Sequence, residues 1–321
     1  MVTLLAGAMI AGAAFLPART FAQVPPRFYW KTLSGAHAVP LIYMPMNGNA
    51  NPLDPAHIVT PGARVEAIVA PVGYARTGVL FDRAAMAAVL LPMGRISSEV
   101  SALGSTVGEQ ASGFGDPLAE LDINVIGKKP IKNIPDLLRY EPGFSLDFLV
   151  DLAFPIGEYH SGQPLNLGQN RWYGRAATPI VWQVGPWVPG RRTTLEFLPS
   201  LWLFGSNDDY LGKTLKTDPL FQLEGHCTRD LTSELWVSLD GTWISGGQAS
   251  IDGVEGEKLN NLGLGYTLGC HVNDNLQITF GYMATVNDSD PGDLQMDGFR
   301  ASTVFGWHPL IEGMKRLKGG E

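Results

Sequence analysis

Residues 231–243 read Leu-Thr-Ser-Glu-Leu-Trp-Val-Ser-Leu-Asp-Gly-Thr-Trp. Apolar and polar residues alternate along this stretch, so an extended chain would have one apolar face and one polar face. A repeat of two residues is typical of a β-strand, because a helix repeats every ~3.6 residues. The same alternation returns in residues 262–268 and 276–282. The sequence therefore predicts three successive long strands, each with one apolar face.

The chain has 321 residues, a hydrophobic content of 45% and a formal net charge of −8. A chain of this size and composition can bury a large core, which argues against a disordered protein or a disulfide-stapled miniprotein. The negative charge argues against nucleic acid as a partner. The mean hydropathy is near zero, which fits a water-soluble protein and equally a barrel whose strands face lipid on one side and water on the other. Composition alone leaves both classes open.

The N-terminus has the pattern of a secretory signal peptide. Residues 4–16 form an apolar run of 13 residues, which is too short to span a membrane as a helix. Thr20 and Ala22 then place small residues where signal peptidase requires them. We expect cleavage after Ala22, so that residues 1–22 are a signal peptide, although neither Lys nor Arg precedes the apolar run. The alternative is an N-terminal core helix.

No later apolar run approaches ~18 residues without a charge, so any association with a membrane must use strands. The two cysteines, Cys227 and Cys270, are too few for a disulfide framework. Both lie at the ends of predicted strands that run in the same direction with one strand between them. That separates them by ~9–10 Å, which is beyond the reach of a disulfide.

Strand-like segments separated by polar loops make up most of the chain. Residues 23–33 are rich in proline and aromatic residues, and we expect them to form a periplasmic lead-in or a short plug. Residues 34–307 are expected to form an outer-membrane β-barrel, and residues 308–321 a periplasmic C-terminal tail. The expected strands are residues 35–46, 64–81, 85–92, 117–127, 144–154, 172–184, 194–204, 215–227, 231–243, 258–271, 275–286 and 298–307.

The expected connections differ in length between the two ends of the strands. Short turns such as residues 228–230 and 272–274 alternate with long polar loops such as residues 96–116 and 244–257. Short periplasmic turns and long extracellular loops are typical of an outer-membrane barrel. Residues 128–143 break the pattern, because they are long where a short turn is due. They are either an ordered periplasmic excursion or the sign of a miscounted strand.

The predicted fold class is therefore all-β, a transmembrane antiparallel up-and-down β-barrel of about 12 strands. The alternative is a secreted, water-soluble β-sandwich with the same alternation. A sandwich would explain the strands, but it would explain neither the difference between the two rims nor the aromatic residues near strand ends on the apolar face. Those aromatic residues are Phe144, Phe154, Trp243, Phe305 and Trp307.

Two short motifs mark loop edges. Residues 113–116, Gly-Phe-Gly-Asp, open a strand, and residues 154–159, Phe-Pro-Ile-Gly-Glu-Tyr, close the next. They resemble the Gly-x-Gly-Asp and Pro-x-Gly-x-Tyr features of the outer-membrane proteins grouped as the phenol meta-pathway degradation family, and the likeness covers roughly residues 81–307. The resemblance implies a transporter-like β-barrel, often encoded beside pathways for aromatic compounds, and it implies no catalytic residues. One departure is the tail, because fourteen residues follow Trp307 where the family has a terminal aromatic residue.

The sequence has no motif that carries catalysis. It lacks a glycine-rich phosphate loop, a paired-cysteine zinc motif and a nucleophile elbow. None of its six histidines has a visible catalytic partner. We therefore expect no catalytic residue, no metal site and no cofactor, and we do not expect an enzyme.

The inward faces of the predicted strands carry mainly acidic residues. They are either a network that closes a narrow pore or a pathway, lined by aromatic residues, that favours cations. With a turn at residues 228–230, Glu224 would face Glu234 across two strands, and this acidic pair would favour cations. The residues assigned to the lumen and substrate pathway are Glu120, Asp122, Asp147, Asp151, Glu196, Trp202, Gln222, Glu224, Glu234, Trp236, Asp240 and Arg300.

The function predicted on these grounds is an outer-membrane channel or transporter for a small aromatic or hydrophobic compound in a Gram-negative cell, and the substrate class rests on the family resemblance. The expected partners are outer-membrane lipid and the small-molecule substrate, without nucleic acid, and the oligomeric state is open. One alternative is an outer-membrane enzyme that acts on lipid, which would need a serine and a histidine brought together. Another is a structural barrel with a sealed lumen.

Overall fold

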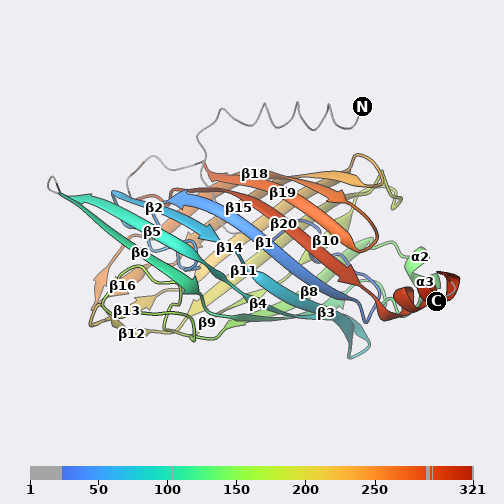
Figure 1. Cartoon of the computed structure of the whole chain (residues 1–321), viewed down its shortest axis with the longest axis horizontal. Coiled ribbons are helices and arrows are strands. Elements are labelled where there is room, and N and C mark those ends of the chain that lie inside the picture. Colours follow the sequence, from blue (N-terminus) through green and yellow to red (C-terminus); the bar gives the residue numbers. More distant parts are fainter. Residues whose placement is uncertain (1–23, 103–104, 287–289, 291, 320–321) are drawn as a thin grey trace.

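The computed structural model describes residues 24–102, 105–286, 290 and 292–319. These residues form an antiparallel barrel, closed by pairing between the first wall strand, β1 (His37–Gly48), and the last, β20 (Met296–Trp307) (Figure 1). The wall contains 12 strands. The prediction of a closed antiparallel barrel with this strand count is confirmed. The proposed signal peptide, residues 1–22, lies outside the described residues.

Eight wall strands run without a break. Besides β1 and β20, they are β8 (Phe144–Ala153), β11 (Thr193–Phe204), β14 (Leu220–Asp230), β15 (Leu235–Gly246), β18 (Leu259–His271) and β19 (Leu276–Thr285). Each of them pairs with its neighbours in the wall in the antiparallel sense, as up-and-down topology requires.

The other four wall strands are each broken into two segments, and a proline stands at every break. The prolines are Pro71, Pro92, Pro117 and Pro179. Proline has no backbone N–H to donate to the sheet, so pairing is interrupted and the strand can bend there. The segments are β2 (Ala63–Val69) with β3 (Val72–Leu80), β4 (Arg83–Leu91) with β5 (Met93–Ala102), β6 (Ser105–Phe114) with β7 (Leu118–Ile126), and β9 (Tyr173–Ala177) with β10 (Ile180–Gln183).

The prediction of a long loop at residues 96–116 was wrong. Most of this stretch belongs to the hairpin β5–β6, whose register runs from Met93 opposite Phe114 to Ala102 opposite Ser105. Its serine, threonine and glycine residues resemble a loop in composition, but paired backbones form a ladder whatever their side chains. The hairpin lengthens two wall strands beyond the proline breaks.

The two ends of the barrel differ. At one end, here called the turn end, connections such as residues 81–82, 231–234 and 272–275 are short. At the opposite, loop end, a second sheet is formed by β12 (Asn207–Tyr210), β13 (Lys213–Thr217), β16 (Ala249–Ile251) and β17 (Val254–Glu255).

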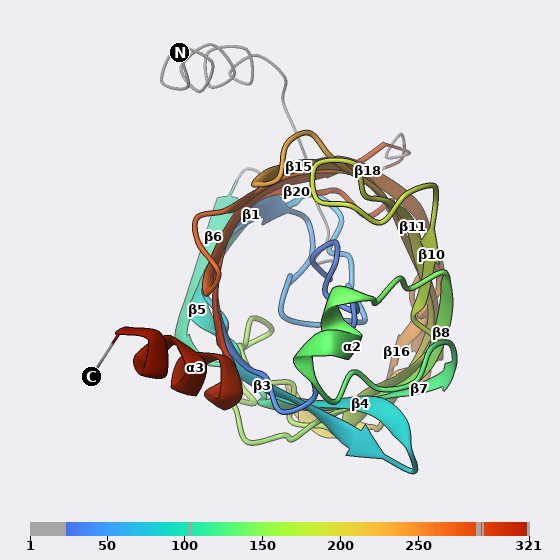
Figure 2. The ribbon, with the colours of Figure 1, turned by 90° about the vertical axis from the view of Figure 1, so that its right-hand side faces the viewer.

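Two helices lie at the turn end (Figures 1 and 2). The long connection at residues 128–143 is an ordered excursion that contains α2 (Ile134–Leu138), which begins after the capping side chain of Asn133. Figure 2 shows α2 across the mouth of the barrel, whereas α3 (Pro309–Gly319) lies outside the ring of strands. Residues 24–33, here called the N-terminal segment, lie inside the ring. Among the described residues, no helix has the length and apolar character needed to cross a membrane.

The alternation predicted from the sequence separates an apolar outer face from a polar inner face. On β15, Leu235, Leu239 and Trp243 are 43%, 71% and 40% exposed, whereas Trp236 and Asp240 between them are 1% and 6% exposed. An apolar outer surface around a closed wall is what a lipid bilayer requires of a barrel.

The predicted register between β14 and β15 was wrong. The connecting turn is residues 231–234, where the hydroxyl oxygen of Thr232 accepts hydrogen bonds from the N–H groups of Glu234 and Leu235. Glu224 therefore faces Thr242 and not Glu234. In an antiparallel pair, the numbers of two facing residues add up to a constant. That constant is 466 (220 + 246) in the structure, whereas the predicted turn would give 458. Both sums are even, so the predicted faces of the strands are unchanged.

The two cysteines lie on either side of β15. Cys227 pairs with Leu239, and Cys270 pairs with Leu235. Both cysteines are free, which agrees with the prediction that the intervening strand keeps them apart.

Candidate functional site

The N-terminal segment lies inside the ring of strands (Figure 2), where it forms hydrogen bonds with the acidic lining of the lumen at the turn end. The Val24 N–H donates to Glu224 Oε2 at 2.8 Å, and the Arg27 N–H donates to Glu196 Oε2 at 2.9 Å. The indole N–H of Trp30 donates to Glu196 Oε1 at 2.8 Å. Two carboxylates assigned to the lumen from the sequence therefore accept hydrogen bonds from a segment that precedes the first wall strand.

Arg27 carries one positive charge of this segment into the lumen. Its Nη1 lies 2.7 Å from Asp230 Oδ1, and both side chains are almost completely buried. The guanidinium group sits between two indole rings, 4.3 Å from the centroid of Trp30 and 4.4 Å from that of Trp236. A planar cation between aromatic faces is favoured electrostatically, and more so where water is excluded.

Lys31 carries a second positive charge. Its Nζ lies 3.0 Å from Asp122 Oδ2 and forms another ion pair with Asp147 Oδ2. Asn124 Nδ2 donates to Asp147 Oδ1 at 2.7 Å. An ammonium group between two buried carboxylates offsets the repulsion between them. Sequence reasoning missed Arg27 and Lys31 as lumen residues, because the N-terminal segment has no strand periodicity that would place them.

Arg175, on β9, binds the acidic residues near the middle of the wall. Its Nε donates to Asp151 Oδ2 at 2.5 Å, and its terminal nitrogens lie 3.6 Å from Glu224 Oε1 and 3.9 Å from Glu120 Oε2. Its guanidinium carbon is 5.1 Å from the ring centroid of Trp202. Sequence reasoning did not place this arginine in the lumen. The alternation from Tyr173 to Ala177 was its only signal, and the break before β10 shortens that pattern.

A fourth polar group centres on Asp240. His226 Nδ1 lies 2.8 Å from Asp240 Oδ1, and the hydroxyls of Ser238 and Thr267 donate to the same carboxylate, each at 2.5 Å. Arg300 Nη2 lies 3.2 Å from Thr267 Oγ1. The carboxylate therefore joins side chains from β14, β15 and β18.

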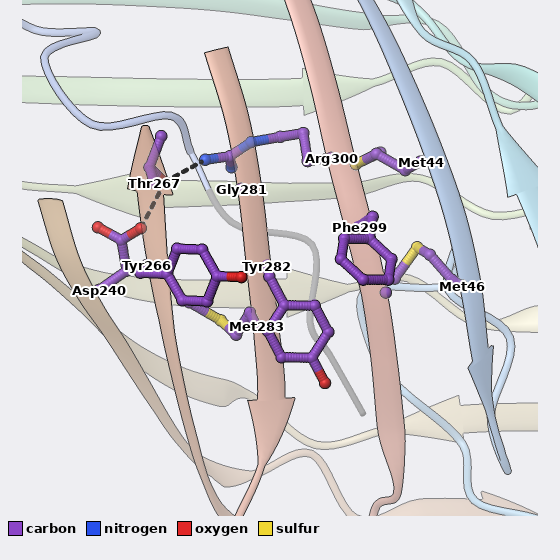
Figure 3. Close-up of a pocket in the computed structure, with 11 residues that line it drawn as sticks. Met44, Met46, Asp240, Tyr266, Thr267, Gly281, Tyr282, Met283, Phe299 and Arg300 are labelled. Atoms are coloured by element: carbon purple, nitrogen blue, oxygen red, sulfur yellow. Dashed lines mark hydrogen bonds between the residues drawn. The ribbon is translucent and has the colours of Figure 1, made fainter. Parts of the chain in front are cut away.

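A small cavity of about 30 Å³ lies beside this group (Figure 3). Gly281 and Gly298 occupy inward positions of β19 and β20, and their missing side chains leave space. Met44, Met46 and Met283 also line the cavity. A cavity needs ~10–15 Å³ of this kind of space to hold one water molecule, so there is room here for water but not for a larger solute. Methionine side chains adapt their shape readily, so this part of the lining can rearrange around a larger guest.

The loop end of the lumen is filled by an apolar cluster. Its members come from the wall strands and from the loops at residues 49–62, 154–172 and 292–295. Apolar filling differs from the polar interior that is usual for water-filled porins. The buried members are Met46, Ala50, Val65, Ala67, Val69, Ile96, Leu165, Leu167, Leu220, Ile244, Leu259, Met283, Leu294 and Met296.

The two motifs behind the family resemblance hold one of these loops in place. Asp116 Oδ1 accepts a hydrogen bond from the Gly157 N–H at 2.9 Å, and its Oδ2 accepts one from the Gln169 N–H at 2.7 Å. A Cβ atom at Gly157 would stand 2.6 Å from neighbouring backbone, so only glycine fits there. The Tyr159 hydroxyl donates to the Asp209 carbonyl at 2.8 Å. The motifs therefore bind the β8–β9 loop to the wall, and that loop supplies two leucines of the apolar cluster.

All lumen residues assigned from the sequence lie on the inner side of the wall except Glu234, which lies exposed in the turn after β14. Glu234 is therefore corrected from a lumen residue to a rim residue, because the turn starts later than predicted. Gln222 connects two of the others, accepting from Trp202 Nε1 at 2.7 Å and donating to Glu224 at 3.1 Å. The inner residues are Glu120, Asp122, Asp147, Asp151, Glu196, Trp202, Gln222, Glu224, Trp236, Asp240 and Arg300.

The group around Asp240 contains a serine and a histidine, but not in a catalytic arrangement. Both Ser238 and His226 bond to the carboxylate, whereas a nucleophilic serine must bond to the histidine that removes its proton. Both side chains also face the buried interior and not the lipid. This geometry does not support the alternative of a lipid-acting enzyme. Within the part of the chain that the structure describes, no cluster of three His, Cys, Asp or Glu residues could hold a metal ion.

The closed wall, the apolar exterior and the polar inner face define a transmembrane β-barrel. Within that class, the chain belongs to the family described as "Putative MetA-pathway of phenol degradation", which matches residues 49–302. The family resemblance inferred from the two motifs is thereby confirmed. A comparison with curated proteins gave no match.

Two solved structures of outer-membrane proteins are similar to this chain to different degrees. An outer membrane channel from Pseudomonas putida F1 has a TM-score of 0.69 and 19% sequence identity, with 88% of this chain and 99% of that chain covered. The beta domain of the Bordetella autotransporter Brka has a TM-score of 0.47 and 11% identity, with 85% of this chain and 100% of that chain covered. The first likeness shows that the fold is that of an outer-membrane channel.

Proposed function

We propose that this protein is an outer-membrane channel for a small aromatic or hydrophobic compound, with the turn end in the periplasm and the loop end outside the cell. The apolar cluster at the loop end carries the proposal, because an apolar solute gains free energy when it leaves water for apolar side chains. The family's description names a phenol degradation pathway, which supports the same class of compound.

The N-terminal segment acts in this proposal as a plug. It fills the lumen at the turn end and is held by the ion pairs of Arg27 with Asp230 and of Lys31 with Asp122. A solute that has entered the apolar cluster meets this segment next, so passage requires the segment to move. Release of the two cations should therefore speed passage.

Uptake of a hydrophobic aromatic dye by Gram-negative cells tests this function. N-phenyl-1-naphthylamine is suitable, because its fluorescence rises when it passes the outer membrane and reaches an apolar environment. Cells that make the protein should take up the dye faster than cells without it. The double variant Met46→Gln/Met283→Gln should slow uptake several-fold by placing amides in the apolar cluster, whereas Arg27→Ala/Lys31→Ala should speed it.

The exposed residue Lys213, on β13, provides a control, because Lys213→Gln should leave uptake unchanged. Migration that changes on heating shows whether each variant folds as a barrel. Equal dye uptake with and without the folded protein, and with the plug released, would exclude the proposed channel. That result would favour the alternative of a structural barrel with a sealed lumen, which the filled lumen also supports.

A further inference from the structure

The helix α3 is fixed to the rim of the barrel at the turn end. Its first turn follows β20 after one intervening residue, His308, whose Nε2 lies 3.1 Å from the Ser34 carbonyl oxygen. Asn275 Nδ2, in the β18–β19 turn, donates to Glu312 Oε1 at 3.3 Å. Figure 2 shows the helix beside the wall and outside the ring of strands. It is therefore held where the outer surface of the barrel ends.

The sequence of α3 is amphipathic. Leu310, Met314 and Leu317 follow each other at spacings of four and three residues, so they fall within ~60° of arc at ~100° per residue. Leu310 is 48% exposed and Met314 is 39% exposed. Neighbouring apolar side chains that are exposed to water on a short rim helix indicate that an apolar surface covers them in the functional state.

The charge of α3 is opposite to that of the chain. The helix contains Lys315, Arg316 and Lys318 against a single acid, Glu312, which gives +2 (3 − 1), whereas the whole chain has −8. A basic helix that combines an apolar stripe with a strongly charged remainder is the type that lies in a membrane interface, with its apolar side in the acyl region and its cations at lipid phosphates.

The neighbouring wall places α3 at the level of that interface. Phe305 and Trp307 end β20, and Phe305 is 50% exposed on the outer face. Trp307 stacks on His37 of β1, with ring centroids 5.1 Å apart. Aromatic residues at strand ends mark the boundary between acyl chains and headgroups. The lipid-facing surface of the wall thus leads directly to α3.

We propose that α3 is an interfacial anchor that lies on the anionic phospholipid of the leaflet at the turn end. This inference rests on the proposed placement of the barrel in the outer membrane, and it assigns a second, separate contact with lipid. Continuity with the lipid-facing wall and the local positive charge favour phospholipid over a second copy of the chain or a soluble protein.

A fluorescent probe on the helix tests the proposal. Gly313 is the site of choice, because a Cβ atom there would have nothing within 4 Å. The full chain with Gly313→Cys, Cys227→Ser and Cys270→Ser is labelled with an environment-sensitive dye and reconstituted into vesicles of phosphatidylcholine alone or with phosphatidylglycerol. We expect blue-shifted emission and roughly twofold or greater protection from iodide with phosphatidylglycerol, and loss of both in Lys315→Gln/Arg316→Gln/Lys318→Gln.

The matched control is a probe at Leu138→Cys, a residue that is 82% exposed on α2, the helix that lies across the mouth of the barrel. It should stay accessible to iodide in every vesicle. Migration that changes on heating shows that each barrel is folded, so failure of the barrel is distinguished from failure of the anchor. A folded barrel whose probe at residue 313 is as accessible as that at residue 138 would overturn the proposal. So would protection that appears only when a second copy or an added soluble protein is present.

Discussion

The two halves of the lumen are filled in different ways. At the loop end, apolar residues of the wall pack mainly against loops that fold inward from between the strands, with one buried ion pair, Arg171 with Asp54, between those loops. At the turn end, buried carboxylates of the wall are paired with cations, two of which arrive on the N-terminal segment. Apolar packing is not directional and tolerates small changes, whereas a buried ion pair is stabilising only while both partners are present.

This difference predicts which half of the barrel loses more stability when a residue is substituted. A substitution in the apolar cluster removes contact area in proportion to the atoms lost. A substitution in the charged half leaves a buried charge without its partner, and the cost then exceeds the value of the lost contact. The charged half should therefore be the more sensitive to single substitutions.

Arg175→Met gives the largest expected effect. The change keeps much of the side-chain volume but leaves Asp151, Glu120 and Glu224 without their shared cation. Removal of one partner of a buried pair costs ~3–5 kcal/mol. The temperature at which the heat-dependent change in migration occurs in detergent measures the loss.

Arg64→Gln is the matched control for this substitution. Arg64 pairs with Glu66 at 3.0 Å, but the two side chains are 75% and 55% exposed. An exposed pair contributes less than ~1 kcal/mol. If Arg175→Met were no more destabilising than Arg64→Gln, the stability of the charged half would not depend on this arginine.

The second effect concerns pH and belongs to the loop end. His57 is buried in the loop after β1, and burial lowers its pKa from 6.5 to about 4. The folded protein therefore keeps the ring neutral, while the unfolded chain binds a proton below about pH 6.5. Stability is complete above that pH and falls as the pH decreases toward 4, with a loss of ~2 kcal/mol at pH 5.

His57→Asn should remove most of this dependence. His57 has a φ of 46°, a backbone conformation that asparagine tolerates. We expect the difference in thermal midpoint between pH 7.5 and pH 5 to be several degrees smaller in the variant. An equal difference in both proteins would assign the acid sensitivity to the carboxylates of the charged half.

Glu234→Gln gives the smallest expected effect. Hydrogen bonds from Ser233 and Thr232 hold the pKa of this exposed carboxyl below its usual value, so it carries its charge at neutral pH. It lies on the rim and not in the lumen. Reversal potentials in planar bilayers should be the same in Glu234→Gln and wild type and should change in Glu224→Gln. A change with Glu234→Gln alone would return this residue to the ion pathway.

The wall of the barrel was largely predictable from the sequence, because an alternation of period two determines both the strand and the face of each residue. The predicted and observed pairing sums are both even, so the error in register does not move any residue to the other face of its strand. The assignments of Glu196 and Asp240 to the inner face are therefore unchanged. The turn after Asp230 was placed too early, because Leu231 and Thr232 fit the alternation of the next strand, although the side chains of Thr232 and Ser233 in fact close the turn. Where prolines such as Pro71 interrupt a strand, the pattern blurs and its bounds are lost.

The partners of the lumen residues were not predictable in the same way. Arg27 meets Asp230 across 203 positions of sequence (230 − 27), and nothing in the periodicity of either segment states that they meet. The same holds for Arg175 with Glu224. Such pairings depend on the diameter of the closed barrel and on the path of a segment that has no regular structure.

The seam between β1 and β20 has a consequence for biogenesis. These strands come first and last in the wall, so the barrel cannot close until the whole chain has been delivered. The N-terminal segment comes before β1 in the chain and lies inside the ring in the folded barrel. Loops are packed at one end of the lumen, and α2 lies across the other. Late threading through either mouth would have to displace these elements. We therefore expect the segment to be enclosed as the seam forms, so that the lumen of each barrel is already occupied when assembly is complete.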